Sequence, residues 1–354
     1  MQARQHGNEL YVGIHSDEDI ARNKGPVVMH QDEREKAINA CKWATKCITD
    51  APYVTDPKFM DSYRCQYVVH GDDITTDANG NDCYQEVKDL GRFIVVKRTP
   101  DISTTDLISR MLSLSKTHHL MPMTAANSRH FLLSHRQIKV MEAYATAEDA
   151  KSSHSGVYAL LDGQILNELV TPSDAVREGL RNAYYVSGSF DLFHPGHMDF
   201  LKHVSTLAKE NDAAVVVGIY DDSTVHQALG DNYPIMNLFE RALCVAQCKY
   251  VDTLVLGAPF TVTRSFIDTL ADKEIYISKV LRGPTPIITD GGSMHNSPSS
   301  NDWLSVQGLF FEIPTNDYSL DTFGIVSRVL TQRRLYEERQ RKKGAKSDHE
   351  KTLL

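Results

Sequence analysis

The sequence predicts an α/β protein made of two similar units, each with a parallel sheet. Short apolar runs at residues 10–15, 67–69 and 184–186 alternate with segments whose apolar residues return at helical spacing. Strands that alternate with helices in this way favour a parallel sheet with crossover helices. The second half of the chain also repeats short strings of the first half, which indicates an internal duplication.

Length and composition limit the classes of protein to be considered. A chain of 354 residues is long enough for two domains, each with its own core. The net charge of −8 gives no reason to expect a nucleic-acid partner. Six scattered cysteines are typical of reduced thiols in a cytoplasmic protein. No apolar run reaches membrane-spanning length, and the first nine residues lack the apolar core of a signal peptide.

The first half is predicted to alternate between strands and helices. Residues 10–15 form the first apolar strand, and Gly25-Pro26 marks the loop that follows a helical turn. The next helix begins at residues 32–34 and carries apolar residues on one face. Further along, the sequence predicts strands at 67–69 and 93–96 and helices around 84–90 and 107–112.

A run of hydroxyl side chains follows the strand at 93–96. Ser103 is a natural N-cap for the next helix, with Thr104, Thr105 and Asp106 in its first turn. A well-capped helix is sufficient to explain this pattern. Because Arg98-Thr99 lies just upstream, the same residues could also cradle a phosphate at a helix N-terminus.

Composition suggests four segments. Residues 1–112 form the first unit, and the less regular, polar residues 113–182 form a linker with short ordered pieces at 137–144 and 157–169. Residues 183–332 form the second unit. The chain then ends in a charged helical tail at 333–354.

The strand at 184–186 leads into the segment with the clearest chemical signal. Gly188 ends this strand, and a helix opens at His194, with His197 three residues later. A strand, a glycine and a helix start place backbone N–H groups where they can bind a phosphate. Gly196 leaves room for a phosphate to approach the backbone. The two histidines alone could equally be helix-capping residues.

The full string Gly188-Ser189-Phe190-Asp191-Leu192-Phe193-His194-Pro195-Gly196-His197 resembles the HxGH signature of the nucleotidyltransferases. Its flanking residues look like the cytidylyltransferase branch, and the duplication is similar to the ethanolamine-phosphate cytidylyltransferase family. The segment from Arg98 to Thr105 resembles the RTxGIST motif of the same branch. The sequence departs from the family at Ser187, where Asp is usual, and at Asp101, where Gly is usual.

The resemblance implies that each half keeps a different part of a Rossmann-like site. Lys24 matches the family's loop lysine, Arg34 its Glu-Arg arginine, and residues 70–73 its His-Gly-x-Asp loop. The first half contains no HxGH, so we expect its sheet to lack the first strand, with residues 10–15 and 67–69 roughly 10 Å apart. The chain would then begin after that strand.

The second half keeps HxGH and Arg241, which echoes Arg34 at an offset of 207 residues (241 − 34). Leu229 stands where the lysine belongs, and Asp321 would repel a phosphate at the last helix. A folded repeat without turnover is therefore the favoured interpretation of this half. The expected catalytic residues are Lys24, His194 and His197; the expected nucleotide-binding residues are Arg34, His70, Gly71, Asp72, Asp73, Arg98, Thr99, Ser103, Thr104, Thr105, Gly188, Phe190, Asp191, Gly196 and Arg241.

The resemblance implies an enzyme that transfers CMP from CTP to phosphoethanolamine, giving CDP-ethanolamine and pyrophosphate, with Mg²⁺ bound to CTP. It also allows a homodimer. One alternative is a catalytically impaired version of that enzyme, which binds nucleotide or regulates a partner subunit. Another is a choline-phosphate or glycerol-phosphate cytidylyltransferase, which the duplication disfavours because those resemble single catalytic units.

Overall fold

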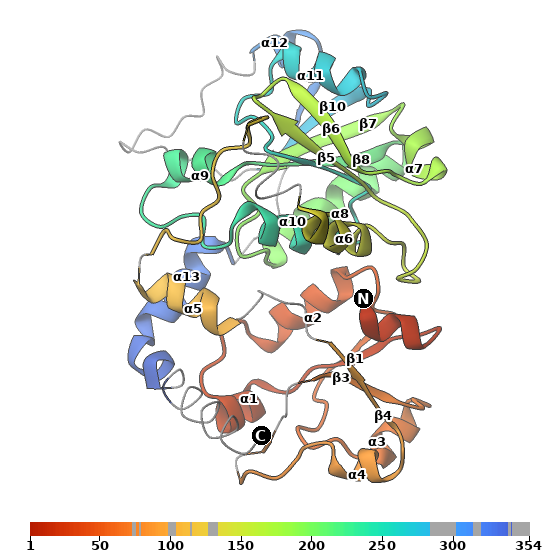
Figure 1. Cartoon of the computed structure of the whole chain (residues 1–354), viewed down its shortest axis with the longest axis vertical. Coiled ribbons are helices and arrows are strands. Elements are labelled where there is room, and N and C mark those ends of the chain that lie inside the picture. Colours follow the sequence, from red (N-terminus) through yellow and green to blue (C-terminus); the bar gives the residue numbers. More distant parts are fainter. Residues whose placement is uncertain are drawn as a thin grey trace. The chain divides into compact units, whose positions relative to one another are not determined.

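The computed structural model describes residues 1–72, 76–77, 79–97, 104–113, 115–126, 134–283, 302–313, 320–338 and 341 (Figure 1). The chain forms two compact units. The first consists of Met1–Asn39, Trp43–Ser113 and Phe323–Leu354, and the second of Ala40–Lys42 and Leu114–Thr322. Both units mix helices with parallel strands, which confirms the predicted α/β class.

The second unit is organised around a seven-stranded sheet in the order β11-β10-β7-β8-β9-β5-β6. All neighbouring strands are parallel except β5 and β6, which form an antiparallel edge. The strand that precedes HxGH lies inside this sheet, paired with β10 on one side and with β8 on the other. The strands are β5 (Gly156–Leu161), β6 (Ile165–Val170), β7 (Ala183–Gly188), β8 (Ala214–Ile219), β9 (Thr253–Leu256), β10 (Ile277–Arg282) and β11 (Phe310–Glu312).

Strands β5 and β6 lie within the segment predicted to be a linker. All six residues of β5 are buried, and β5 pairs with β9, which follows almost a hundred residues later. Residues 156–170 therefore belong to the core of the second unit. The helices of this unit are α6 (His135–Tyr144), α7 (Asp174–Gly179), α8 (Pro195–Lys209), α9 (Asp222–Leu229), α10 (Leu238–Ala246), α11 (Arg264–Ala271) and α12 (Asp302–Val306).

The first unit contains two separate two-stranded parallel sheets, β1-β2 and β3-β4. By order and connection, β1 corresponds to β8 and β3 to β10. Within the described residues, no strand of this unit corresponds to β7, and β1 does not pair with β3. This confirms the predicted gap in the sheet, while its width stays a prediction. The strands are β1 (Tyr11–Gly13), β2 (Lys46–Ile48), β3 (Val68–Gly71) and β4 (Phe93–Val96).

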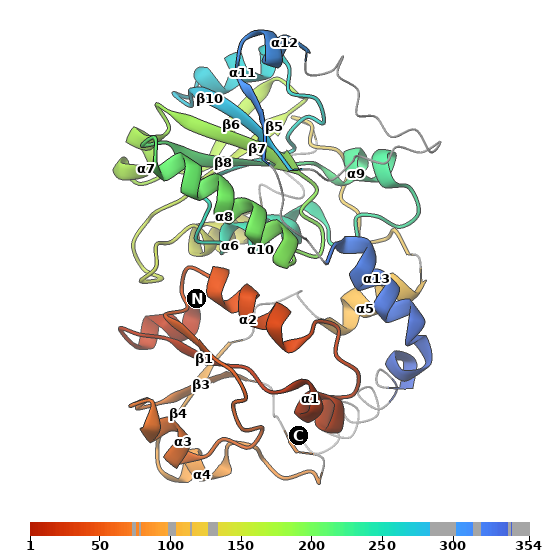
Figure 2. The same cartoon turned by 180° about the vertical axis from the view of Figure 1, so that it is seen from behind.

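Helices surround these short sheets (Figure 2). They are the 3-10 helix η1 (Gln2–His6), α1 (Asp17–Lys24), α2 (Gln31–Ala40), α3 (Pro57–Ser62), α4 (Gln85–Asp89), α5 (Thr104–Ser113) and α13 (Thr322–Thr331). Both views show α13 beside α5. From Phe323 onward, the chain thus belongs to the first unit, although its sequence echoes the end of the first repeat.

Close packing shows the duplication in the backbone as well as in the sequence. A Cβ atom on Gly13 would lie 2.9 Å from the Ala51 Cβ, and one on Gly218 would lie 2.8 Å from the Ala258 Cβ. Glycine is required at both places because a side chain would collide with the neighbouring alanine. In each unit, the strand that carries this glycine (β1 or β8) thus packs against an alanine in the loop that follows β2 or β9.

Candidate functional site

The HxGH segment forms the start of α8 in the second unit. Pro195 is the first helical residue, and its fixed φ suits that position. The rings of His194 and His197 stack with centroids 3.8 Å apart, and the His194 N–H donates to the His197 Nδ1 at 3.4 Å. Burial, followed by the nearby His194, holds the pKa of His197 well below its usual range. His197 is therefore a neutral hydrogen-bonding group at the mouth of the helix, and the His194 ring stacks against it.

The segment that precedes α13 lies against the same helix mouth. A Cβ atom on Gly196 would be 2.9 Å from the Leu320 carbonyl oxygen and 3.1 Å from the His194 ring. The Thr322 hydroxyl donates to the Asp191 carbonyl at 2.9 Å. Position 196 thus requires glycine because a side chain there would collide with the Leu320 carbonyl. The sequence did not reveal this contact.

The other residues predicted around HxGH are buried. The Asp191 carboxylate is 1% exposed and accepts hydrogen bonds from the N–H groups of Leu192, Ile235 and Met236 at 2.7–3.0 Å. Burial raises the Asp191 pKa to about 6, although Arg241 and the three N–H donors oppose the shift. The Asp191 side chain therefore joins the loop after β7 to the loop before α10.

Aromatic contacts fix the turn between the strand and α8. Phe190 has a φ of 50° and is 3% exposed, and its ring centroid lies 5.2 Å from that of His197. A Cβ on Gly188 would lie 3.2 Å from the Phe190 ring, which explains this glycine by packing.

Arg241 is fully buried at the centre of the second unit's loops. Its guanidinium donates to the carbonyls of Met236, Ser189 and Tyr220 and forms an ion pair of 2.7 Å with Asp222, which is also buried. The planar guanidinium has enough donors to bind all of them at once. Arg241 thereby ties the turn after β7 to the loops after β8 and before α10.

Arg34 makes the corresponding set of bonds in the first unit. It donates to the carbonyls of Met29 (3.1 Å) and His15 (2.9 Å) and pairs with Asp17 (2.5 Å). Burial alone would raise the Asp17 pKa, but the hydrogen bond from Arg34 and others outweigh it and hold that pKa below its usual value. The two predicted nucleotide-binding arginines thus organise the same loops in both units, and their contact with a nucleotide stays a prediction.

Lys24 is exposed at the end of α1, immediately before Gly25 (φ 91°). Its Nζ atom lies 5.6 Å from the Tyr53 ring centroid, and that centroid lies 4.9 Å from the His15 ring. Burial lowers the His15 pKa, although a hydrogen bond with Ala51 at 2.9 Å opposes the shift. The structure therefore gathers Lys24 and Arg34 around His15 and Tyr53.

The remaining predicted residues of the first unit are at the ends of other elements. His70 and Gly71 end β3, with the His70 ring 4.7 Å from that of Tyr84, and Asp72 follows them. Thr104 and Thr105 form the first turn of α5. The predicted site residues Asp73, Arg98, Thr99 and Ser103 lie outside the described residues.

Sequence reasoning missed several supporting residues. His15, Asp17 and Tyr53 surround the Lys24 and Arg34 side chains, and Asp222 occupies the place of Asp17 in the second unit. Their signal was the echo of residues 11–17 in 216–222 and of residues 51–53 in 258–260, which indicated the duplication without indicating their roles.

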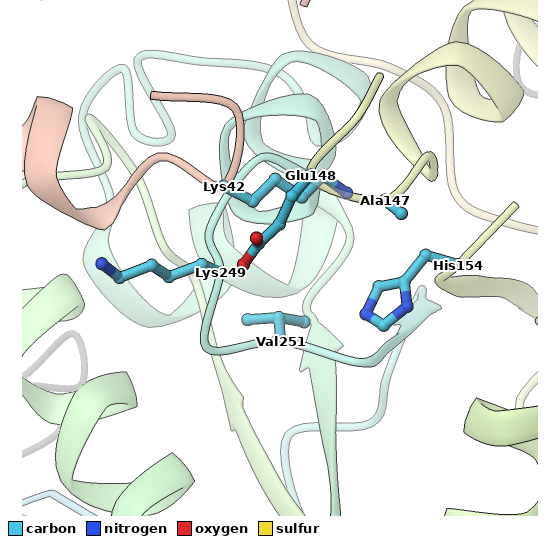
Figure 3. Close-up of a pocket in the computed structure, with 6 residues that line it drawn as sticks. All are labelled: Lys42, Ala147, Glu148, His154, Lys249 and Val251. Carbon is cyan, nitrogen blue, oxygen red and sulfur yellow. The ribbon is translucent and has the colours of Figure 1, made fainter. Parts of the chain in front are cut away.

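A separate pocket of about 170 Å³ lies in the second unit (Figure 3). Lys42 is only 6% exposed there, donates to the Tyr144 carbonyl at 2.7 Å, and has a pKa lowered to about 8 by burial. None of its lining residues belongs to the predicted site. They are Lys42, Ala147, Glu148, His154, Lys249 and Val251.

Two kinds of feature are absent from the part of the chain that the structure describes. No group of three or more His, Cys, Asp or Glu side chains there could hold a metal ion. In the same residues, each helix is too short or too polar to cross a membrane.

Comparison with known proteins identifies the family. The cytidylyltransferase-like family model matches residues 1–110 and again 185–296, once in each repeat. Ethanolamine-phosphate cytidylyltransferase of Mus musculus is 37% identical over 98% of this chain and 84% of its own length. This chain belongs to the ethanolamine-phosphate cytidylyltransferase family. It is thus a nucleotidyltransferase by family, with its catalytic residues still to be tested.

Other relatives support the same family. The enzyme of Dictyostelium discoideum is 36% identical over 98% of this chain and 89% of its own length. A choline-phosphate cytidylyltransferase of Arabidopsis thaliana is 40% identical, but the match covers only 29% of this chain. The likeness to choline-phosphate enzymes is therefore confined to one repeat, whereas the family relationship spans both. Enzymes of this type that use CTP generally need a divalent metal.

Proposed function

We propose that this protein transfers CMP from CTP to phosphoethanolamine, giving CDP-ethanolamine and pyrophosphate. The observation that best supports this proposal is the similarity to ethanolamine-phosphate cytidylyltransferases, which extends across both repeats. In the reaction, the phosphate oxygen of phosphoethanolamine attacks the α-phosphorus of CTP, and the bond to pyrophosphate breaks. The protein must hold the triphosphate, neutralise the charge that develops, and align the two substrates.

In the first unit, Lys24 supplies the mobile cation. Its exposed position at the end of α1 suits contact with phosphate oxygens, and Arg34 fixes the surrounding loops. The N-terminus of α5, with Thr104 and Thr105, offers hydroxyl and N–H donors for phosphate. The motif residues Arg98, Thr99 and Ser103, together with residues 70–73, complete the proposed nucleotide site.

In the second unit, His194, Gly196 and His197 form a weaker phosphate site at the mouth of α8. Leu320 and Thr322 of the same unit lie against this mouth, which favours a second candidate function: a nucleotide-binding repeat with little or no turnover. Calorimetric titration of the full chain with CMP, using His197→Ala for comparison, tests this site. Unchanged binding by the variant would place the nucleotide elsewhere.

Mg²⁺ is proposed to enter with CTP as part of the substrate complex. Oxygen atoms of the triphosphate are ligands that Mg²⁺ prefers, and the ion keeps several waters when it binds. It would screen the phosphate charges while Lys24 and the helix N-termini contact the remaining oxygens. We also expect a homodimer in the cytoplasm, which sedimentation and cell fractionation test.

The deciding experiment measures CDP-ethanolamine formation from CTP and phosphoethanolamine, with phosphocholine as the alternative acceptor. Lys24→Ala should lower kcat on the order of a hundredfold, because a cation that stabilises the transition state is lost. Lys58→Ala, which removes another exposed lysine in α3, is the matched control. Preference for phosphocholine, or near-normal turnover by Lys24→Ala, would contradict the proposal.

A further inference from the structure

Residues 25–30 form the loop between α1 and α2, directly after Lys24. Two residues of α2 hold its far end. The Arg34 Nε donates to the Met29 carbonyl at 3.1 Å, and the His30 N–H donates to the Glu33 carboxylate at 2.7 Å. The position of the Glu33 side chain therefore affects the backbone of the loop.

The C-terminal helical segment holds the same loop from another direction. The Tyr336 hydroxyl donates to the Val27 carbonyl at 2.8 Å, and Tyr336 is fully buried. On α13, both terminal nitrogens of Arg328 donate to Glu33, each at 2.6 Å. All four of these residues belong to the first unit.

The Arg328–Glu33 pair has the geometry of a strong interaction. It is bidentate, and the side chains are only 28% and 10% exposed, so water screens it less than a surface pair. Burial alone would raise the Glu33 pKa, but hydrogen bonds from Arg328 and His30 outweigh it and hold that pKa below its usual value. Glu33 is therefore ionised at neutral pH and fixed in orientation.

Arg328 and Arg110 occupy corresponding places in the two repeats. Arg328 echoes Arg110 of α5 in the string Ser-Arg that both helices contain. Arg110 forms an ion pair with Asp106 one turn earlier in its own helix. Arg328 contacts a carboxylate 295 positions away in the sequence, so it links two elements of the first unit that are far apart in the chain.

We propose that Arg328 is a positioning residue for Lys24. Through Glu33 and the loop of residues 25–30, it holds the lysine at the end of α1 where the CTP phosphates bind. This inference rests on the proposed function and extends it to a residue more than 300 positions from the lysine. Arg328 itself touches no substrate.

The test compares the full-length protein with Arg328→Met, Arg328→Lys and the control Arg333→Met, which removes an exposed pair with Glu337 within one helix. Hydrogen exchange of peptides that cover residues 25–34 reports the loop. Calorimetry gives the Kd for CTP, and product formation gives kcat. Arg328→Met should speed exchange of these peptides about tenfold and weaken CTP binding or turnover at least tenfold. The exchange rates, Kd and kcat of Arg328→Lys should lie between those of the wild type and those of Arg328→Met, since lysine keeps the charge without the bidentate geometry.

Unchanged exchange at residues 25–34 in Arg328→Met would overturn the inference. Faster exchange with normal CTP binding and turnover would also overturn it, because the pair would then be merely structural. In both cases the wild-type protein still uses CTP. A wild-type protein that neither binds CTP nor forms product would instead refute the proposed function.

Discussion

Replacing Arg241 by Met tests whether the buried arginine holds the loops of the second unit together. The variant loses donors to three carbonyls and leaves the Asp222 carboxylate buried without its cation. Breaking a buried ion pair from one side costs about 3–5 kcal/mol. Asp222 keeps one offsetting contact, a hydrogen bond from the Leu120 N–H at 2.8 Å, so the lower end of that range is expected.

The duplication supplies a matched control. Arg34 makes the same kind of contacts in the first unit, but the Arg34 and Asp17 side chains are 20% and 29% exposed. Water can replace the lost donors there, so Arg34→Met should cost only about 1–2 kcal/mol. The comparison thus isolates the effect of burial on one interaction.

Each unit contains one of the two tryptophans, so the unfolding of each unit can be followed separately by fluorescence. Trp43 reports the first unit and Trp303 the second, so urea unfolding in Trp43→Phe and Trp303→Phe backgrounds gives each unit's free energy of unfolding. Adding Asp222→Asn to Arg241→Met should recover more than 1 kcal/mol by removing the unpaired charge. Equal losses at the two arginines, or no recovery in the double variant, would refute the reasoning.

Three further predictions concern the second unit, each followed by Trp303 fluorescence. Gly196→Ala should destabilise it by about 1–3 kcal/mol, because the new Cβ would meet the Leu320 carbonyl at 2.9 Å; an unchanged urea midpoint would contradict this. Because the His197 pKa is depressed in the folded chain, the unfolded chain binds more protons than the folded chain at pH values below the ordinary histidine pKa of 6.5. Stability should therefore be fully present above about pH 6.5 and fall as the pH drops further, and His197→Gln should flatten that slope. The Lys42 pKa, lowered from 10.5 to about 8, means that the unfolded chain also binds more protons between these values, so stability should rise with pH across that window and Lys42→Met should abolish the rise.

The sequence predicted those parts of the fold that depend on local pattern. The buried strand before HxGH and the helix after it were located because their apolar periods are short and regular. The role of β5 was missed because its partner β9 is distant in sequence, and no local pattern encodes such a pairing. The membership of α13 in the first unit was missed for the same reason, since it depends on contacts such as Arg328 with Glu33.

Prediction of the site was limited by a different factor. A motif gives the residue types of a site but not the direction of each side chain. Asp191 belongs to the signature string, yet its carboxylate binds three backbone N–H groups in the interior. Tyr53 lies outside the HxGH, Glu-Arg, His-Gly-x-Asp and RTxGIST motifs, yet its ring lies beside Lys24.

The divided sheet of the first unit determines the order in which the protein should come apart. A parallel pair of three- or four-residue strands is marginal by itself, so β1-β2 and β3-β4 depend on the surrounding helices for their stability. The seven-stranded sheet of the second unit has its central strands paired on both edges. Unfolding should therefore proceed in two stages, and brief exposure to a protease should cleave the first unit while a fragment containing the second persists. A single melting temperature would describe neither stage.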